Sequence, residues 1–250
     1  MRQFEKYMEH FGDVPGWFEK PSVALWDALL ARQTERGLNG LLMEVGVWEG
    51  KSAALMALHC TETESCMFLD IRAMDGAKSR IEQVVPEAKC VFMQKNSRSV
   101  LQQPSILEMA DRVRWMHIDG EHTAEAVMCD LQNADLLVAR SGMVVIDDFF
   151  SPAYPQVTQA VFQFLATRPS RFCLVLCGFN KGYLCRPIAA RSYLEFIKNS
   201  LYEEISSRGV SETTIWRTTE PSDMVTFGIT DRYLNHKYRG PDWDEFHVPA

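Results

Sequence analysis

Two apolar runs of this chain end on acidic side chains. One run leads into Asp119 and, three positions later, His122. The other leads into the pair Asp147 and Asp148. The carboxyl ends of parallel strands open on one edge of a sheet, so we expect these side chains to converge there. Clustered carboxylates repel one another unless a cation lies among them, and hard oxygen ligands favour Mg²⁺. The pattern therefore predicts a magnesium site.

A second group of residues surrounds a glycine turn that follows another apolar run. The turn lies in Glu44-Val-Gly-Val-Trp-Glu-Gly-Lys-Ser52, where Gly46 and Gly50 let the backbone come close to a ligand. The spacing lacks the third glycine of a dinucleotide fingerprint, and Val45 stands where a phosphate-binding loop has its first glycine. The turn therefore predicts a pocket for a ligand without a pyrophosphate.

Asp70 ends the next apolar run, about twenty residues beyond the glycine turn. At this distance an acidic side chain meets ribose hydroxyls, and its two oxygens suit two vicinal hydroxyl groups. The alternative is that Asp70 caps a helix that begins near residue 73.

The elements that position these residues alternate between strand and helix. Apolar runs predict strands at 41–47, 66–69, 91–93, 113–118 and 142–146, with helical patterns at 51–59, 73–85 and 123–138. This alternation implies parallel strands, because parallel neighbours need crossovers. Two further strands at 172–176 and 182–186 are expected to pair antiparallel. We therefore expect an α/β, Rossmann-like, doubly wound and mostly parallel sheet of seven strands, with helices on both faces and an antiparallel strand near its C-terminal end.

The same pattern divides the chain into three parts of one domain. Residues 1–40 form a lead-in and a helix, 41–186 the core, and 187–250 an appendage with a hairpin that turns at 220–223. We expect the appendage to contact the substrate or a second copy of the chain in a homo-oligomer.

The motif order resembles the class I S-adenosylmethionine-dependent methyltransferases over roughly residues 41–186. It is more closely similar to the metal-dependent natural-product O-methyltransferases of the macrocin and mycinamicin type. The resemblance implies that S-adenosylmethionine is bound by Glu44, Gly46, Gly50, Ser52, Asp70, Asn96, Ser97 and Asp119. An ordinary turn is the alternative for Asn96 and Ser97.

In these relatives the strand-end acids bind a metal and the following histidine is the general base. The resemblance thus assigns Mg²⁺ to Asp119, Asp147 and Asp148, and the base to His122. A hydroxyl of a small-molecule acceptor, a sugar or phenolic secondary metabolite, would bind Mg²⁺, lose its proton to the histidine and attack the sulfonium methyl. Catechol enzymes of this fold use a lysine base and an Asp-Asn pair, which this chain does not reproduce, so a catechol substrate is disfavoured.

Simpler interpretations exist for each of these residues. His122 is alternatively a polar residue at a helix N-terminus, and the pair Asp147 and Asp148 a turn. Three alternative functions also stay open: an NAD-dependent oxidoreductase, a non-catalytic S-adenosylmethionine-binding protein, and a protein like cephalosporin hydroxylase.

Composition limits the partners. The 250 residues carry a net charge of −7 and no long run of Lys and Arg, which argues against a nucleic-acid partner. The apolar runs are shorter than the ~18 residues of a membrane span, and the polar N-terminus has no signal core. The seven scattered cysteines are typical of reduced thiols. We expect a soluble, cytoplasmic protein whose partners are small molecules, not membranes.

Overall fold

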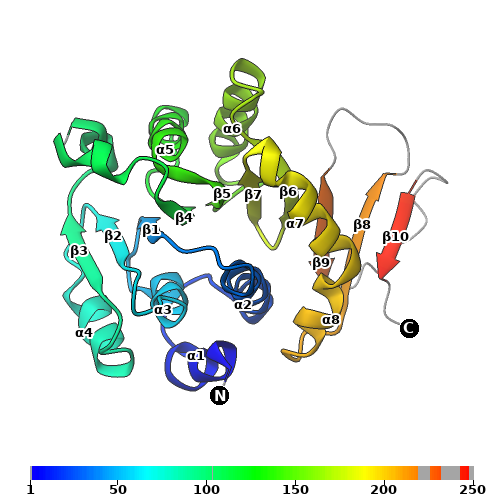
Figure 1. Ribbon diagram of the computed structural model, residues 1–250, viewed down its shortest axis with the longest axis horizontal. Coiled ribbons are helices and arrows are strands. Elements are labelled where there is room, and N and C mark those ends of the chain that lie inside the picture. The colour runs from blue at the N-terminus through cyan, green and yellow to red at the C-terminus, as the bar shows by residue number, and fades with distance from the viewer. Residues whose placement is uncertain (1, 103, 219–225, 232–242, 248–250) are drawn as a thin grey trace.

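A single mixed β-sheet forms the centre of the molecule (Figure 1). The computed structural model describes residues 2–102, 104–218, 226–231 and 243–247. In chain order, the strands are β1 Leu41–Val45, β2 Cys66–Asp70, β3 Cys90–Gln94, β4 Val113–Ile118, β5 Val138–Ile146, β6 Cys173–Gly178, β7 Lys181–Cys185, β8 Thr213–Thr218, β9 Phe227–Asp231 and β10 Trp243–His247. Their order across the sheet is β10-β8-β9-β6-β7-β5-β4-β1-β2-β3.

Helices cover both faces of this sheet, as predicted (Figure 1). One face carries α1 Gln3–Phe11, α2 Lys20–Glu35, α3 Lys51–Leu58, α4 Asp75–Val84, α7 Pro187–Asn199 and α8 Leu201–Ser206. The other carries α5 Ala124–Leu137, α6 Pro155–Thr167 and the 3₁₀ turns η1 Ser97–Gln102 and η2 Pro104–Met109. No helix in the described part of the chain is long and apolar enough to cross a membrane.

The five N-terminal strands are parallel, which confirms the prediction from alternating strands and helices. Strand β1 pairs with β2 and β4, β2 with β3, and β4 with β5. The carboxyl ends of these strands therefore share one edge, and the loops that follow them meet there.

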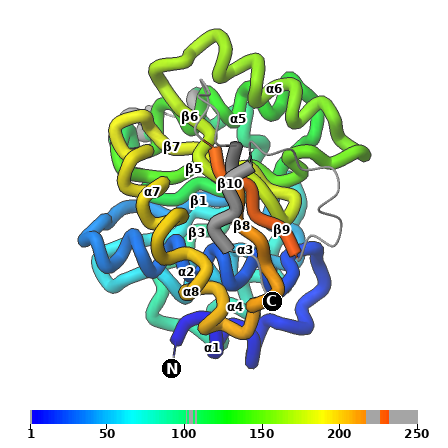
Figure 2. Tube along the Cα trace, turned by 90° about the vertical axis from the view of Figure 1, so that its right-hand side faces the viewer, coloured from blue at the N-terminus to red at the C-terminus, as the bar shows by residue number. Residues whose placement is uncertain are grey.

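The prediction of seven strands was wrong, because ten strands in the described residues form the sheet. Strands β6 and β7 pair antiparallel as expected, and β7 pairs antiparallel with β5. The segment after residue 186 then returns to the sheet, where β9 runs parallel to β6 and pairs antiparallel with β8. Figure 2 shows these added strands beside α7 and α8. The turn predicted at 220–223 lies outside the described residues.

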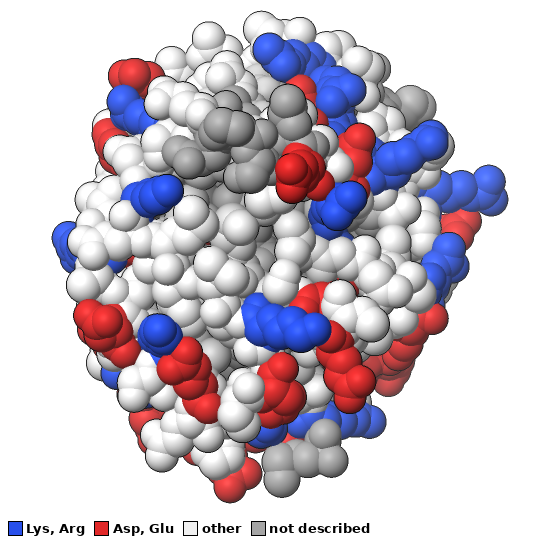
Figure 3. Space-filling view, turned by 60° about the vertical axis from the view of Figure 1, so that its left-hand side comes forward, with Lys and Arg blue, Asp and Glu red and all other residues white. Residues whose placement is uncertain are grey.

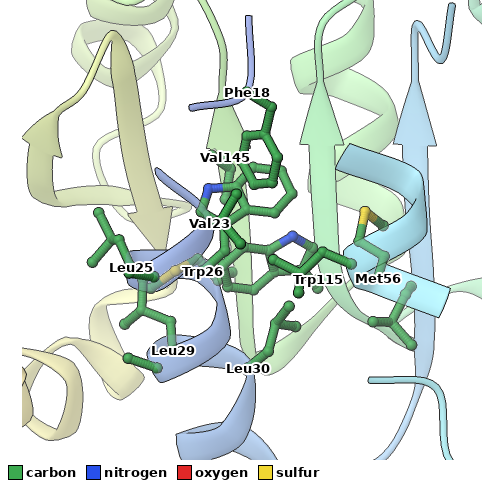
Figure 4. Packing of buried hydrophobic residues seen from close by; sticks show 14 of the residues in the cluster. Phe18, Val23, Leu25, Trp26, Leu29, Leu30, Met56, Trp115 and Val145 are labelled. Carbon is green, nitrogen blue, oxygen red and sulfur yellow. The ribbon is translucent and has the colours of Figure 1, made fainter. Parts of the chain in front are cut away.

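The larger core centres on two tryptophans. Trp26 of α2 packs edge-on against Trp115 of β4, with ring centroids 5.1 Å apart (Figure 4). Both are fully buried, and the Trp26 indole donates a hydrogen bond to the hydroxyl of Tyr183 on β7. These contacts fix helix α2 against strands β4 and β7 of the sheet.

Candidate active site

A cavity of about 900 Å³ opens at the carboxyl ends of the parallel strands. It is lined by all of the residues predicted to act in the site except Glu44 and Gly50. The fold thus brings together residues from the carboxyl ends of five parallel strands, β1 to β5. The volume lies near the upper end of the ~300–1,000 Å³ typical of small-ligand sites, so a cofactor and an acceptor fit together.

The two glycines of the turn after β1 have different neighbours. Gly46 adopts φ +84°, and a Cβ there would lie 1.9 Å from the carbonyl oxygen of Asp119, so only glycine lets the ends of β1 and β4 come this close. Gly50 precedes α3 at φ +80°, and a Cβ there would lie 2.6 Å from the Cβ of Ala77 on α4. Gly46 therefore forms a wall of the cavity, whereas Gly50 serves helix packing.

Asp70 braces the glycine turn. Its Oδ2 accepts hydrogen bonds from the backbone N–H groups of Val47 (2.8 Å) and Trp48 (2.9 Å), and its Oδ1 accepts one from Arg72 (2.8 Å). It does not cap α4, whose N-cap residue is Met74. The capping alternative was therefore wrong, and Asp70 lies in the cavity wall with carboxylate oxygens that can accept further hydrogen bonds.

Asn96 and Ser97 line the cavity and also form a turn. The Asn96 side chain accepts a hydrogen bond from the backbone of Arg98, and the Ser97 carbonyl accepts one from Asn133 on α5. The turn interpretation and the cavity position are thus compatible.

His122 meets two strand-end acids at the cavity. Its Nε2 lies 2.9 Å from Asp148 Oδ2 and 3.5 Å from Asp119 Oδ1. The ring of Tyr154 stacks on the imidazole, with centroids 4.1 Å apart and planes 14° apart. The neighbouring Asp119 raises the pKa of His122 above its usual value, and burial raises the pKa of Asp119 to about 6.

Asp147 points away from this group toward two buried cationic side chains. Lys181, at the start of β7, forms an ion pair with its Oδ2, and the Nε2 of His117 lies 3.5 Å from the same atom. Burial alone would raise the pKa of Asp147, but Lys181 and His117 hold it well below its usual range.

Glu44 lies beneath the cavity in the same buried network. Its Oε1 accepts a hydrogen bond from the Ser52 hydroxyl (2.5 Å) and lies 2.6 Å from His117 Nδ1. Burial alone would lower the pKa of His117, but the neighbouring carboxylates of Asp147 and Glu44 outweigh it and raise the pKa to about 9. His117 is therefore protonated at neutral pH.

Sequence analysis missed His117 and Lys181. The histidine lies within an apolar strand, where it resembles any core residue, and the lysine begins a strand far along the chain. The only local signal for Lys181 is a charged residue at the start of a fully buried strand.

The donor set fits a divalent cation. The ligand atoms of Asp119, His122 and Asp148 all lie within 4.8 Å of one another. Asp147 belongs to a different group with His117 and Asp119, so the structure divides the predicted metal triad. Lys181 and His117 are paired with Asp147 and Glu44, so the carboxylates of Asp119 and Asp148 supply the negative charge that a cation would neutralise.

Comparison with known proteins gives the same fold. Residues 43–149 match a family model described as a methyltransferase domain. The O-methyltransferase NovP is 17% identical with a TM-score of 0.50, over 66% of this chain and 80% of that one. An O-methyltransferase from Bacillus cereus in complex with SAH is 14% identical with a TM-score of 0.51, over 73% and 88%. None of the curated proteins compared with the chain matches it significantly.

One solved structure of this fold holds both a metal and a cofactor product. It is the methyltransferase MycE from the mycinamycin biosynthetic pathway, in complex with Mg and SAH. The identity is 14% and the TM-score 0.53, over 74% of this chain and 55% of MycE.

Proposed function

We propose that this chain, whose residues 43–149 match a family model described as a methyltransferase domain, is a class I S-adenosylmethionine-dependent methyltransferase and, more narrowly, an Mg²⁺-dependent O-methyltransferase of small molecules. The observation that carries this proposal is His122, whose Nε2 faces Asp119 and Asp148 at the cavity. A base beside two carboxylates suits removal of a proton from a hydroxyl group.

We place S-adenosylmethionine against the glycine turn. Gly46 would give it room, Asp70 would accept hydrogen bonds from the ribose hydroxyls, and Asn96 and Ser97 would border the adenine. Ser52 acts indirectly here, because its hydroxyl is bound to Glu44. The cofactor supplies an electrophilic methyl group.

Asp119 and Asp148 would hold Mg²⁺, because Lys181 already neutralises Asp147. When bound, Mg²⁺ supplies Lewis acidity that lowers the pKa of the acceptor hydroxyl. His122 accepts the proton at Nε2, and Tyr154 keeps the imidazole in plane for that transfer. The rest of catalysis is orientation of the acceptor and exclusion of water. As the acceptor we propose a sugar or phenolic hydroxyl of a natural product; MycE, which has a similar fold, comes from the mycinamycin biosynthetic pathway.

Calorimetric titration with S-adenosylmethionine, NAD and Mg²⁺ tests the binding steps. We expect S-adenosylmethionine to bind and NAD not to bind. Mg²⁺ should bind the wild type and be lost from Asp148→Asn. Binding of NAD in place of S-adenosylmethionine would show that the chain is an oxidoreductase instead.

Turnover of a screened acceptor tests the base. His122→Gln should lower kcat by about 100-fold or more and leave the affinity for S-adenosylmethionine unchanged. His10→Gln, which alters a histidine on α1 outside the lining of the cavity, should retain full activity. Wild-type turnover in His122→Gln would refute the assignment of the base.

A further inference from the structure

Exposed apolar side chains gather at the mouth of this cavity. Seven large apolar residues are exposed in the described part of the chain, and four of them line the cavity: Trp17, Trp48, Ile71 and Tyr154. A cluster of exposed apolar residues often marks a binding site, whereas single exposed apolar residues are common on any protein surface. Trp17 is the extreme case, with 84% of its surface exposed.

Trp17 is held in a defined position by its neighbour. Its indole stacks on that of Trp48, with centroids 5.1 Å apart and planes 18° apart. Trp48 belongs to the glycine turn, where its backbone N–H donates a hydrogen bond to the Asp70 carboxylate. Trp48 therefore stacks on one face of Trp17, and 84% of the Trp17 surface stays exposed.

The loop that carries Trp17 is tied to α3 and α1. The Lys51 ammonium donates a hydrogen bond to the Gly16 carbonyl (3.2 Å), and the hydroxyl of Tyr7 donates one to the Lys51 carbonyl (3.0 Å). Gly16 adopts φ +144°, and a Cβ there would lie 3.2 Å from the Lys51 side chain. The next residue, Phe18, is buried in the core against Trp26. The residues on both sides of Trp17 in the chain are therefore anchored. Trp17 thus presents a large apolar surface, and binding does not have to order a loose loop.

We propose that Trp17 is an acceptor-binding residue: with Trp48 stacked on one side of its indole, its exposed face stacks on a planar aromatic ring of the acceptor. This inference rests on the proposed function and adds the class of acceptor. Indoles stack well on planar rings in offset parallel geometry, and the Trp17–Trp48 pair is itself arranged in that way.

Binding of a flat phenol to the SAH-loaded protein tests the proposal. The probe is 4-methylumbelliferone, and methyl α-L-rhamnopyranoside serves as the sugar probe. We expect Trp17→Ala to weaken binding of the phenol about tenfold, and Trp17→Phe, which keeps a flat ring, to weaken it about threefold or less. Ile188→Ala is the matched control, because Ile188 is exposed on α7 and does not line the cavity; it should bind the phenol like the wild type.

The affinity for SAH separates this inference from the proposed function. SAH should bind wild type and Trp17→Ala equally, because Trp17 contacts the acceptor and not the cofactor. Failure of SAH to bind the wild type would overturn both proposals. If SAH binds normally, three results would overturn the acceptor inference and leave the proposed function intact. These are a wild type that does not bind the phenol, a Trp17→Ala variant that binds the phenol as tightly as the wild type, and a dependence on Trp17 of sugar binding alone.

Discussion

Asp147 illustrates how one acidic residue at a strand end is stabilised by cations from distant parts of the chain. Lys181 pairs with it from β7, and His117 approaches it from β4. Lys181 is 2% exposed, so water contributes little to the solvation of its charge. A buried ion pair of this kind adds little net stability, but removal of one partner leaves an uncompensated buried charge.

We therefore predict that Lys181→Met lowers the free energy of unfolding by about 3–5 kcal/mol, measured by urea denaturation. The double variant Lys181→Met with Asp147→Asn should lose less than the sum of the two single variants, because it leaves no unpaired charge. Additive losses would show that the two side chains do not interact.

The acids of the site could be predicted from the sequence, and their cationic partners could not. Asp119 and Asp147 each follow an apolar run, which marks a strand end without knowledge of the fold. Lys181 reaches Asp147 only because β7 pairs antiparallel with β5, with Gly182 opposite Ile146. No local pattern specifies that two strands become neighbours when the paired residues are 34 positions apart in the sequence.

At the scale of elements, buried ion pairs join helices that lie far apart in the sequence. Asp27 of α2 lies 2.6 Å from the Arg208 guanidinium, after α8, and 2.7 Å from His59, after α3. All three side chains are buried. Burial alone would raise the pKa of Asp27, but His59 and Arg208 hold it below its usual value.

A carboxyl group whose pKa is lowered on folding contributes stability above its unfolded pKa, and that stability is lost as the pH falls through the folded pKa. We predict that Asp27→Asn lowers the free energy of unfolding by about 3–5 kcal/mol at pH 7. The difference from wild type should shrink as the pH falls below about 4.

Urea denaturation at pH 7 and pH 3 measures both quantities. Asp13→Asn, at an exposed position before α2, is the control and should match the wild type at each pH. A deficit in Asp27→Asn that is the same at both pH values would contradict the assigned linkage.

Elements of the parallel half were easier to predict than those of the C-terminal half. Strand β4 was predicted with its observed bounds, because its six residues are all buried and are followed by an acid and a glycine. Strand β9, by contrast, contains a glycine, a threonine and an aspartate among five residues, so apolar periodicity does not reveal it. Only pairing with β6 and β8 makes it a strand.

At the scale of the whole molecule, the two ends of the chain belong to one core. Tyr7 and Phe11 of α1 are buried in the same cluster as Phe196 of α7 and Ile205 of α8. Basic and acidic side chains are interspersed on the face shown in Figure 3. We infer that the lead-in, core and appendage unfold together.

Binding of S-adenosylmethionine should therefore stabilise the entire chain and not one part of it. At a ligand concentration 100 times the Kd, linkage adds about 2.7 kcal/mol to the free energy of unfolding. For a chain of this size, that corresponds to an increase in Tm on the order of 5–10 °C. Differential scanning calorimetry should show one transition that shifts as a unit.

Asp70→Ala, tested at the same ligand concentration, should show a smaller shift because it loses a ribose contact. A second transition that ignores the ligand would mean that the C-terminal strands form an independent unit, and an undiminished shift in Asp70→Ala would mean that Asp70 only braces the glycine turn.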